Sequence, residues 1–135
     1  MNIRQIMTTR IVAVELGDRL AMVKEIFEQS KLHHVLVVED RKLYGVVSDR
    51  DLLKALSPSL GTTSETSRDR AALNQQVHQI MTRKPITLPP DATIADAVDL
   101  LVTHNISCIP VVDAEFRPLG IVTWRDVLKA LASGQ

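Results

Sequence analysis

An internal repeat constrains the fold of this 135-residue chain more than any other feature. Residues 5–8 (QIMT) return as residues 79–82, and residues 45–51 (GVVSDRD) match residues 120–126 (GIVTWRD) after one extra residue in the second copy. Homologous repeats tolerate a single insertion when it falls in a turn between strands. We therefore interpret the chain as two copies of one structural unit.

Both copies predict the same order of elements, β-α-β-β-α. A brief extended segment at 11–14 or 86–88 precedes a helix in which apolar residues follow helical spacing. Two short aliphatic strands follow, and a helix at 49–56 or 124–132 closes each copy. A single copy of ~55 residues would be marginally stable alone, so the copies should pack against each other. The predicted fold class is α+β.

Several polar residues predict where helices begin. Asn2 is expected to cap a short helical turn that ends near Met7, and residues 93–96 (TIAD) have the pattern of a capping box. In the first copy Arg19 stands where the second copy has Thr93, so Asp18 is expected to cap that helix instead.

A stretch of turn-forming residues separates the two copies. The predicted organisation is a first repeat at 1–57, a linker at 58–76 and a second repeat at 77–135. Residues 65–76 within the linker fit an additional short helix.

Composition excludes several classes of function. Sixteen basic residues balance sixteen acidic ones, whereas a protein that binds nucleic acid needs a basic face. Aromatic residues make up 3% of the chain, too few for a base-stacking RNA surface. The aliphatic runs are a few residues long, against ~18 or more for a membrane span. With one cysteine, Cys108, and no signal-peptide pattern, we expect a cytoplasmic protein that binds neither nucleic acid nor membrane.

The sequence shows no pattern typical of a metal centre or an active site. No cysteine or carboxylate stands at ligand spacing from His33 and His34, which we expect to be partly buried or to line a cleft. The five glycines are scattered singly, so a glycine-rich phosphate loop is absent. We expect no bound metal and no enzymatic activity.

The repeated pieces together resemble a tandem pair of cystathionine-β-synthase (CBS) domains, which form a stand-alone Bateman module. The matching pieces are the Ile-Met openings, the helices after Asp18 and Asp91, the strand at 109–113 (IPVVD) and the paired Gly-h-h-Ser/Thr-x-Arg-Asp endings, where h is aliphatic. The resemblance covers almost everything except residues 58–76. The run at 48–53 (SDRDLL), followed by SPS at 57–59, resembles bacterial two-CBS proteins of the acetoin-utilisation accessory type.

This resemblance implies a regulatory module in which two clefts, related by a pseudo-twofold axis, bind AMP, ADP, ATP, NAD or S-adenosylmethionine. No other cofactor is implied. In such modules the Asp of the Ser/Thr-x-x-Asp motif holds the ribose hydroxyls, and a carboxylate is suited to accept bidentate hydrogen bonds from a diol. The hydroxyl and the arginine of the motif face phosphate. The implied ribose ligands are Asp51 and Asp126, and the implied phosphate ligands are Ser48, Arg50, Thr123 and Arg125.

The resemblance also implies that the adenine side of each cleft comes from the opposite repeat. The residues expected near Asp51 are Thr82, Ile86, Ile106 and Cys108. The residues expected near Asp126 are Thr8, Val12, Leu32 and His34.

Two interpretations of the Ser/Thr-x-x-Asp motifs stay open. They are ligand-binding residues, or they cap the closing helices without any ligand, which stabilises a helix by ~1 kcal/mol. The first interpretation predicts an adenosine-ligand sensor that signals to an unidentified effector protein. The alternative is a ligand-free scaffold for dimerisation or protein interaction. Under both interpretations the chain is expected to form a homodimer. The two copies would be joined through apolar helix faces at 26–27, at 100–101 and on the closing helices.

Overall fold

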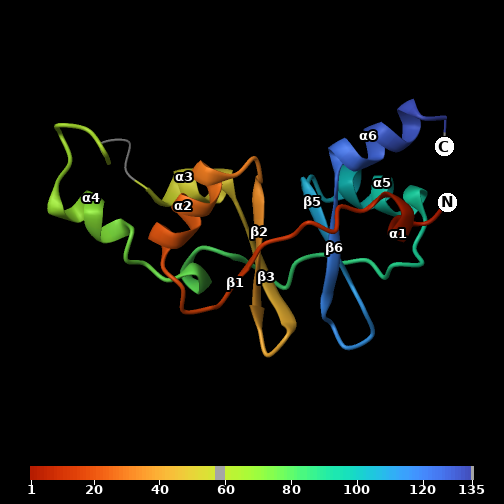
Figure 1. The fold of residues 1–135 in the computed structure, drawn as a ribbon, viewed down its shortest axis with the longest axis horizontal. Helices are drawn as coiled ribbons and strands as arrows, with labels where there is room; N and C mark the ends of the chain where they lie inside the picture. Colours follow the sequence, from red (N-terminus) through yellow and green to blue (C-terminus); the bar gives the residue numbers. More distant parts are fainter. Residues whose placement is uncertain (57–59, 135) are drawn as a thin grey trace. The chain divides into compact units, whose positions relative to one another are not determined.

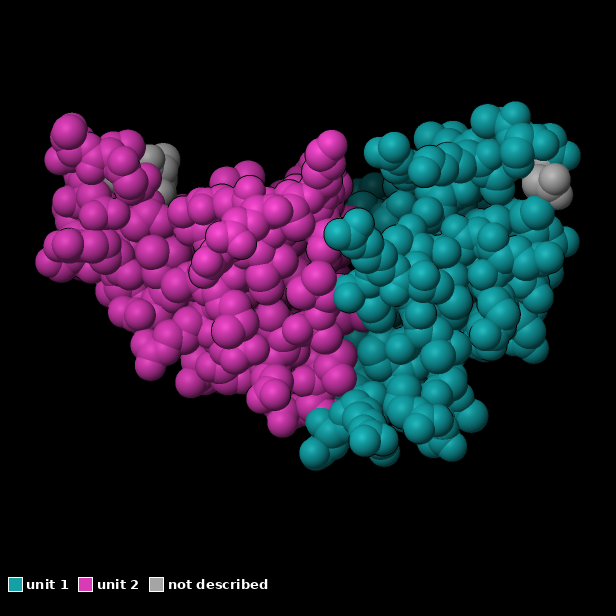
Figure 2. All heavy atoms as spheres, viewed as in Figure 1, with its two compact units in different colours: residues 1–11, 40–43, 85–135 teal, residues 12–39, 44–84 magenta. Residues whose placement is uncertain are grey.

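A computed structural model describes residues 1–56 and 60–134 (Figure 1). Residues 57–59, at the expected junction of first repeat and linker, and Gln135 lie outside the described residues. The chain forms two compact units, which Figure 2 colours separately: unit 1 comprises residues 1–11, 40–43 and 85–135, and unit 2 comprises residues 12–39 and 44–84. Each unit therefore contains the body of one repeat and the opening segment of the other.

Unit 2 is built on the four-stranded sheet, in the order β1-β2-β3-β4. Strand β1 runs parallel to β2, and β4 runs antiparallel to β3, with Thr82 opposite Val46. The first two residues of β3 belong to unit 1. The elements are β1 (Ala13–Val14), α2 (Leu20–Gln29), β2 (His34–Glu39), β3 (Lys42–Ser48), α3 (Asp49–Ala55), α4 (Ser67–Ala72), the 3-10 helix η1 (Val77–Gln79) and β4 (Thr82–Arg83). Helix α4 lies inside the segment that fitted an additional helix.

Unit 1 contains the two-stranded antiparallel sheet of β5 and β6. Its elements are α1 (Ile3–Ile6), α5 (Ile94–Thr103), β5 (Cys108–Val112), β6 (Pro118–Thr123) and α6 (Trp124–Ala132). The expected extended segment at 86–88 contributes a single parallel bridge, between Leu88 and Val111, instead of a strand. Prolines at positions 85, 89 and 90 lack the N–H that a longer ladder needs. Helices and strands together give the predicted α+β class.

The predicted cap of α5 is confirmed, and the predicted cap of α2 is wrong. Helix α1 begins after Asn2 as expected, but Asn2 Oδ1 accepts no hydrogen bond within the described residues. Thr93 and Asp96 exchange hydrogen bonds of 3.0 and 3.1 Å, and the Asn2 N–H donates to the Gln5 side chain over 2.8 Å. Asp18 does not cap α2, because its carboxylate accepts from the Glu15 N–H over 2.7 Å. The first N–H groups of α2 donate instead to the carbonyl oxygens of residues 75 and 73, over 2.9 and 3.0 Å. The segment after α4 therefore satisfies the N-terminus of α2.

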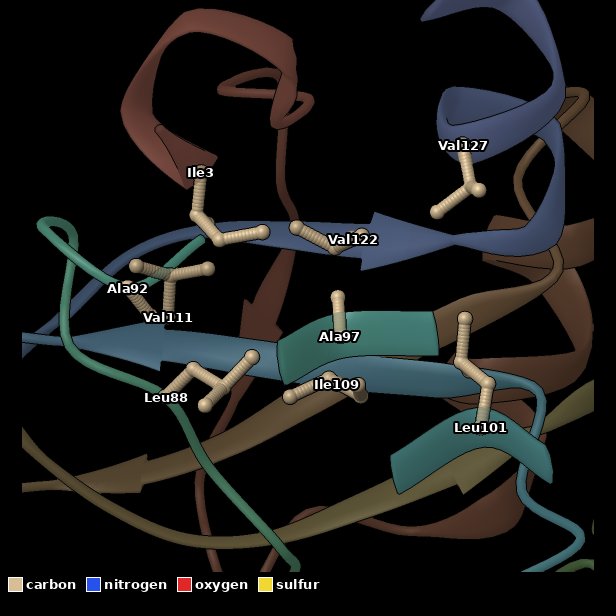
Figure 3. Packing of buried hydrophobic residues seen from close by; sticks show 9 residues of the cluster. All are labelled: Ile3, Leu88, Ala92, Ala97, Leu101, Ile109, Val111, Val122 and Val127. Atoms are coloured by element: carbon tan, nitrogen blue, oxygen red, sulfur yellow. The ribbon is translucent and has the colours of Figure 1, made fainter. Parts of the chain in front are cut away.

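Each unit has a hydrophobic core of its own. In unit 1, α1, α5 and α6 pack side chains against β5 and β6, and Figure 3 shows nine buried residues of this cluster. Leu101 is 1% exposed within that core, so the expectation that it forms part of a dimer surface is wrong. Helical spacing marks two adjacent apolar faces on α5, and the face with Ala97 and Leu101 is the one that covers the sheet. In unit 2 the corresponding core includes Leu20, Val23 and Val47.

The opening segment of each repeat crosses a glycine of the strand that it meets. A Cβ built on Gly45 would lie 2.8 Å from the Thr82 carbonyl oxygen, and one on Gly120 would lie 2.6 Å from the Thr8 carbonyl oxygen. Side chains do not approach backbone atoms this closely, so only glycine fits at either position. The repeated Gly of the two endings therefore brings residues 8 and 82 next to the strands that lead into the Ser/Thr-x-x-Asp motifs.

No helix within the described residues is long and apolar enough to cross a membrane.

Candidate functional site

The first Ser/Thr-x-x-Asp motif lies where β3 passes into α3. The Ser48 N–H donates to Asp51 Oδ2 over 2.9 Å, and the Asp51 N–H donates to Ser48 Oγ over 3.0 Å. Ser48 and Asp51 are half-buried, whereas Arg50 points from an exposed position on the first turn. This is the reciprocal capping box that the spacing predicted. It fixes the Asp51 carboxylate at the carboxyl end of β3, where α3 begins.

The second motif lies where β6 passes into α6, and its hydrogen bonds differ. Asp126 Oδ2 accepts from the Thr123 N–H over 2.9 Å and from the Thr123 hydroxyl over 3.2 Å. Asp126 Oδ1 accepts from the Thr8 hydroxyl over 2.9 Å. The Asp126 carboxylate is therefore engaged on both oxygens, and one partner comes from the far end of the sequence. Arg125 is exposed, as Arg50 is.

Backbone pairing explains how Thr8 reaches Asp126. The Thr8 N–H donates to the Ile121 carbonyl over 2.8 Å, and the Ile121 N–H donates to the Thr8 carbonyl over 2.9 Å. In unit 2, Thr82 has the matching position opposite Val46 of β3. The structure thus brings Thr8 to Asp126 and places Thr82 in the sheet that leads to Asp51.

His34 and Cys108 occupy matching positions as the first residues of β2 and β5. Burial lowers the pKa of His34, an effect that the carboxylates of Asp49 and Asp51 partly offset. Burial raises the pKa of Cys108 to about 12, with a further increase from the negative charge of Asp126. The thiol is therefore neutral and the imidazole favours its neutral form at pH 7.

These two side chains experience the carboxylate of their own unit, although the resemblance assigned each to the cleft of the other motif. Cys108 lies next to the second motif because it is directly opposite Thr123 in the β5–β6 ladder. Ile106 packs against the core of unit 1 and Val12 against that of unit 2, while Ile86 and Leu32 are half-buried. The crossed assignments that join residues of different units, namely those of Ile86, Ile106, Cys108, Val12, Leu32 and His34, stay predictions.

A hollow of about 260 Å³ adjoins Asp126 in unit 1. It lies between α1 and the last turns of α6, and its lining residues are Met1, Gln5, Ile6, Asp126, Lys129, Ala130 and Ser133. Lys129 lies one helical turn after Asp126 and adds a cation to this hollow. Sequence reasoning missed Gln5 and Lys129, although the spacing of three residues from Asp126 to Lys129 could have indicated the latter.

The residue that follows each hydroxyl makes the two motifs electrostatically different. Asp49 Oδ2 lies within hydrogen-bond distance of His33 Nδ1, at 2.8 Å, and adds a second carboxylate to the first motif. Trp124 has the matching position in the second motif and is 41% exposed. Within the described part of the chain, no three His, Cys, Asp or Glu side chains are placed to hold a metal ion.

Comparisons with known proteins identify both repeats. The model of the CBS domain family matches residues 3–58 and 77–133. The Methanocaldococcus jannaschii protein MJ1426 is 35% identical, with 97% of this chain and 91% of that protein covered. Among solved structures, CBSX2 in complex with AMP is similar with a TM-score of 0.80 and 26% identity, over 98% of this chain and 96% of that one. The Vibrio cholerae protein AcuB, described as an acetoin utilization protein, has a TM-score of 0.79 and 25% identity, over 98% and 91% of the two chains.

Proposed function

Because the chain belongs to the CBS domain family, with both repeats matched, we propose that it is a regulatory module that binds an adenosine-containing ligand. The observation that carries this proposal is the pair of half-buried carboxylates, Asp51 and Asp126, fixed where a strand passes into a helix. The similarity to CBSX2, whose structure contains AMP, supports an adenosine ligand. AMP, ADP, ATP, NAD and S-adenosylmethionine are the candidates.

In this proposal each motif contributes three side chains: a carboxylate for the ribose, and a hydroxyl (Ser48 or Thr123) and an arginine for the phosphate. The carboxylate accepts hydrogen bonds from the ribose hydroxyls, which are charge-assisted and therefore strong. The guanidinium groups of Arg50 and Arg125 are exposed and offer planar forks of donors to a phosphate. The hollow next to Asp126 is smaller than the ~300–1,000 Å³ typical of ligand sites, so it would take part of a nucleotide.

Signalling requires that the ligand favour one conformation of the protein over another. We propose no catalytic step, because the ligand's function here is to shift that equilibrium. The single cysteine fits a reducing compartment, and we propose that the module acts in the cytoplasm. Its output would be an effector protein that recognises one of the two conformations.

We also propose that the module is a homodimer joined through its closing helices. Leu53 on α3 is 73% exposed, and Leu128 and Leu131 on α6 are 58% and 57% exposed. Apolar side chains on matching positions of the two repeats are suited to an interface between copies. The same leucines favour the second candidate function, a scaffold that binds partner proteins without a ligand.

Thermal unfolding with and without ligands distinguishes the two functions. A ligand at 100 times its Kd stabilises the native state by ~2.7 kcal/mol, a shift of several degrees. Each adenosine compound should be added at millimolar concentration to the wild type and to the double variant Asp51→Asn/Asp126→Asn. The matched control is Asp96→Asn, because Asp96 makes the same capping hydrogen bonds on α5 outside both motifs.

The sensor proposal expects a shift in the wild type and in Asp96→Asn, but none in the double variant. If no adenosine compound shifts any of the three proteins, the scaffold is the better account.

A further inference from the structure

We propose that the two motifs bind ribose in a fixed order, Asp51 first, because Thr8 competes with the ligand for Asp126. This inference rests on the proposed function, since it concerns which carboxylate takes the diol. It makes Thr8 a residue that sets the affinity of one cleft, instead of a neutral part of the adenine side.

A carboxylate can accept only a limited number of hydrogen bonds. Its two oxygens offer about four lone-pair positions for hydrogen bonds. Asp126 already accepts three, from the Thr8 hydroxyl, the Thr123 hydroxyl and the Thr123 N–H. About one position remains, whereas a ribose diol donates two hydrogen bonds. A diol at Asp126 must therefore displace at least one hydroxyl.

In the described part of the chain, the Asp51 carboxylate accepts fewer hydrogen bonds than that of Asp126. Its carboxylate accepts the Ser48 N–H, and the Ser48 hydroxyl accepts from the Asp51 N–H instead of donating to the carboxylate. Within the described residues this leaves lone pairs on Asp51 for both hydroxyls of a diol. The matching threonine, Thr82, lies in the same sheet as the first motif and is exposed.

Among the groups that donate to Asp126, the Thr8 hydroxyl can move away without breaking backbone hydrogen bonds. Its position is fixed through the backbone, by the two hydrogen bonds with Ile121. Rotation about χ1 can therefore remove the hydroxyl from Asp126 while the strand pairing stays intact. The Thr123 N–H has no such freedom, because its direction is set by the turn from β6 into α6.

The size of the effect follows from hydrogen bonding to a charged group. A hydrogen bond to a charged group contributes more than a neutral one, and its loss reduces an affinity roughly 10- to 100-fold. We therefore expect AMP to bind the cleft of Asp51 at least about tenfold more tightly than the cleft of Asp126.

Calorimetric titration with AMP of the wild type and four single variants tests this order. Asp51→Asn and Asp126→Asn keep an acceptor for the capping N–H but remove the charge. Thr8→Val removes the competing hydroxyl with little change in volume, and Thr8→Ser is its matched control because it keeps the hydroxyl. Far-ultraviolet circular dichroism of each variant reports whether it is folded.

The expected result has three parts. The tighter binding step disappears in Asp51→Asn and persists in Asp126→Asn. Thr8→Val tightens the weaker step roughly tenfold or more, or reveals it where the wild type shows only one. Thr8→Ser keeps the competing hydroxyl, so its weaker step stays roughly tenfold or more weaker than that of Thr8→Val.

Two results would overturn the inference while leaving the proposed function intact: a tighter step that depends on Asp126, or a Thr8→Val protein whose weaker step is unchanged or weakened. Should either Asp variant fail to fold, the comparison of Thr8→Val with Thr8→Ser decides alone. If the wild type gives no heat with AMP, the candidate that does bind replaces AMP in the titration. Absence of heat with all five candidates would instead remove the proposed function itself.

Discussion

The carbonyl oxygen of Thr8 lies 2.6 Å from the position that a Cβ on Gly120 would occupy. In the other unit the carbonyl oxygen of Thr82 lies 2.8 Å from the corresponding position on Gly45. The glycine that recurs in both motif endings is thus required by the opening segment that crosses it. The same crossing delivers the Thr8 hydroxyl to Asp126, so the glycine shapes the site as well as the fold.

Replacing either glycine should destabilise the protein. We expect Gly120→Ala and Gly45→Ala each to lower the free energy of unfolding by roughly 1–3 kcal/mol, because the new methyl group overlaps backbone oxygen and methionine sulfur. Gly17→Ala is the matched control, since nothing lies within 4 Å of a Cβ there. Urea denaturation measures all three. Equal stability of Gly120→Ala and Gly17→Ala would contradict this account of the crossing.

A helix cap should contribute more to the stability of the protein when its helix buries side chains in a core. Thr93→Ala removes the cap of α5, which buries Ala97 and Leu101, and should cost about 1 kcal/mol in global stability. Thr66→Ala removes the same hydrogen bond from α4, which has no buried residues. We expect that variant to change global stability by less than about 0.5 kcal/mol. The difference between the two denaturation midpoints is the measurement, and equal losses would show that α4 is part of the cooperative core.

Truncation to alanine should change stability strongly at one position of α5 and very little at the adjacent one. Leu101 is 1% exposed and Val102 is 63% exposed. Leu101→Ala is expected to cost roughly 2–5 kcal/mol, because it leaves a cavity in the core of unit 1. Val102→Ala is expected to change stability by less than about 0.5 kcal/mol. Chemical denaturation tests both, and a small effect at Leu101 would mean that this face of α5 does not cover the sheet.

The Cys108 thiol should resist alkylation in the native protein. Only the thiolate reacts, and with a pKa of about 12 its fraction at pH 8 is roughly one in ten thousand. Iodoacetamide labelling followed by mass spectrometry should be slow in buffer and fast in denaturing urea. The positive control is Val102→Cys in a Cys108→Ala background, which places a thiol at an exposed position. Labelling of native Cys108 as fast as that control would contradict the burial found here.

Local patterns in the sequence predicted most elements of the fold. The capping box at Thr93 and the motif endings are built from residues three positions apart, and such neighbours meet wherever a helix begins. The α+β class followed equally well, because the repeat doubled the evidence for each strand and helix. Family resemblance supplied the roles of Asp51 and Asp126, which spacing alone also fits as helix caps.

Contacts between residues far apart in the sequence could not be predicted from those local patterns. The two QIMT segments are identical, so nothing in them says which strand each one crosses. Asp18 fitted a helix cap, yet carbonyl oxygens of the segment after α4 take that function. The hydrogen bond between Thr8 and Asp126 joins residues 118 positions apart. The family resemblance placed Thr8 near Asp126, whereas the hydrogen bond itself depends on the pairing of Thr8 with Ile121.

The most direct test of the central claim is a ¹H–¹⁵N correlation spectrum of the wild type, titrated in turn with AMP, ATP and S-adenosylmethionine. Our account predicts that at least one compound shifts the backbone amides of residues 48–51 or 123–126, while the amides around the equivalent cap of α5 at 93–96 stay in place. A spectrum that none of the three compounds changes, or one in which only amides remote from both motifs move, would contradict the claim that these carboxylates bind an adenosine ligand.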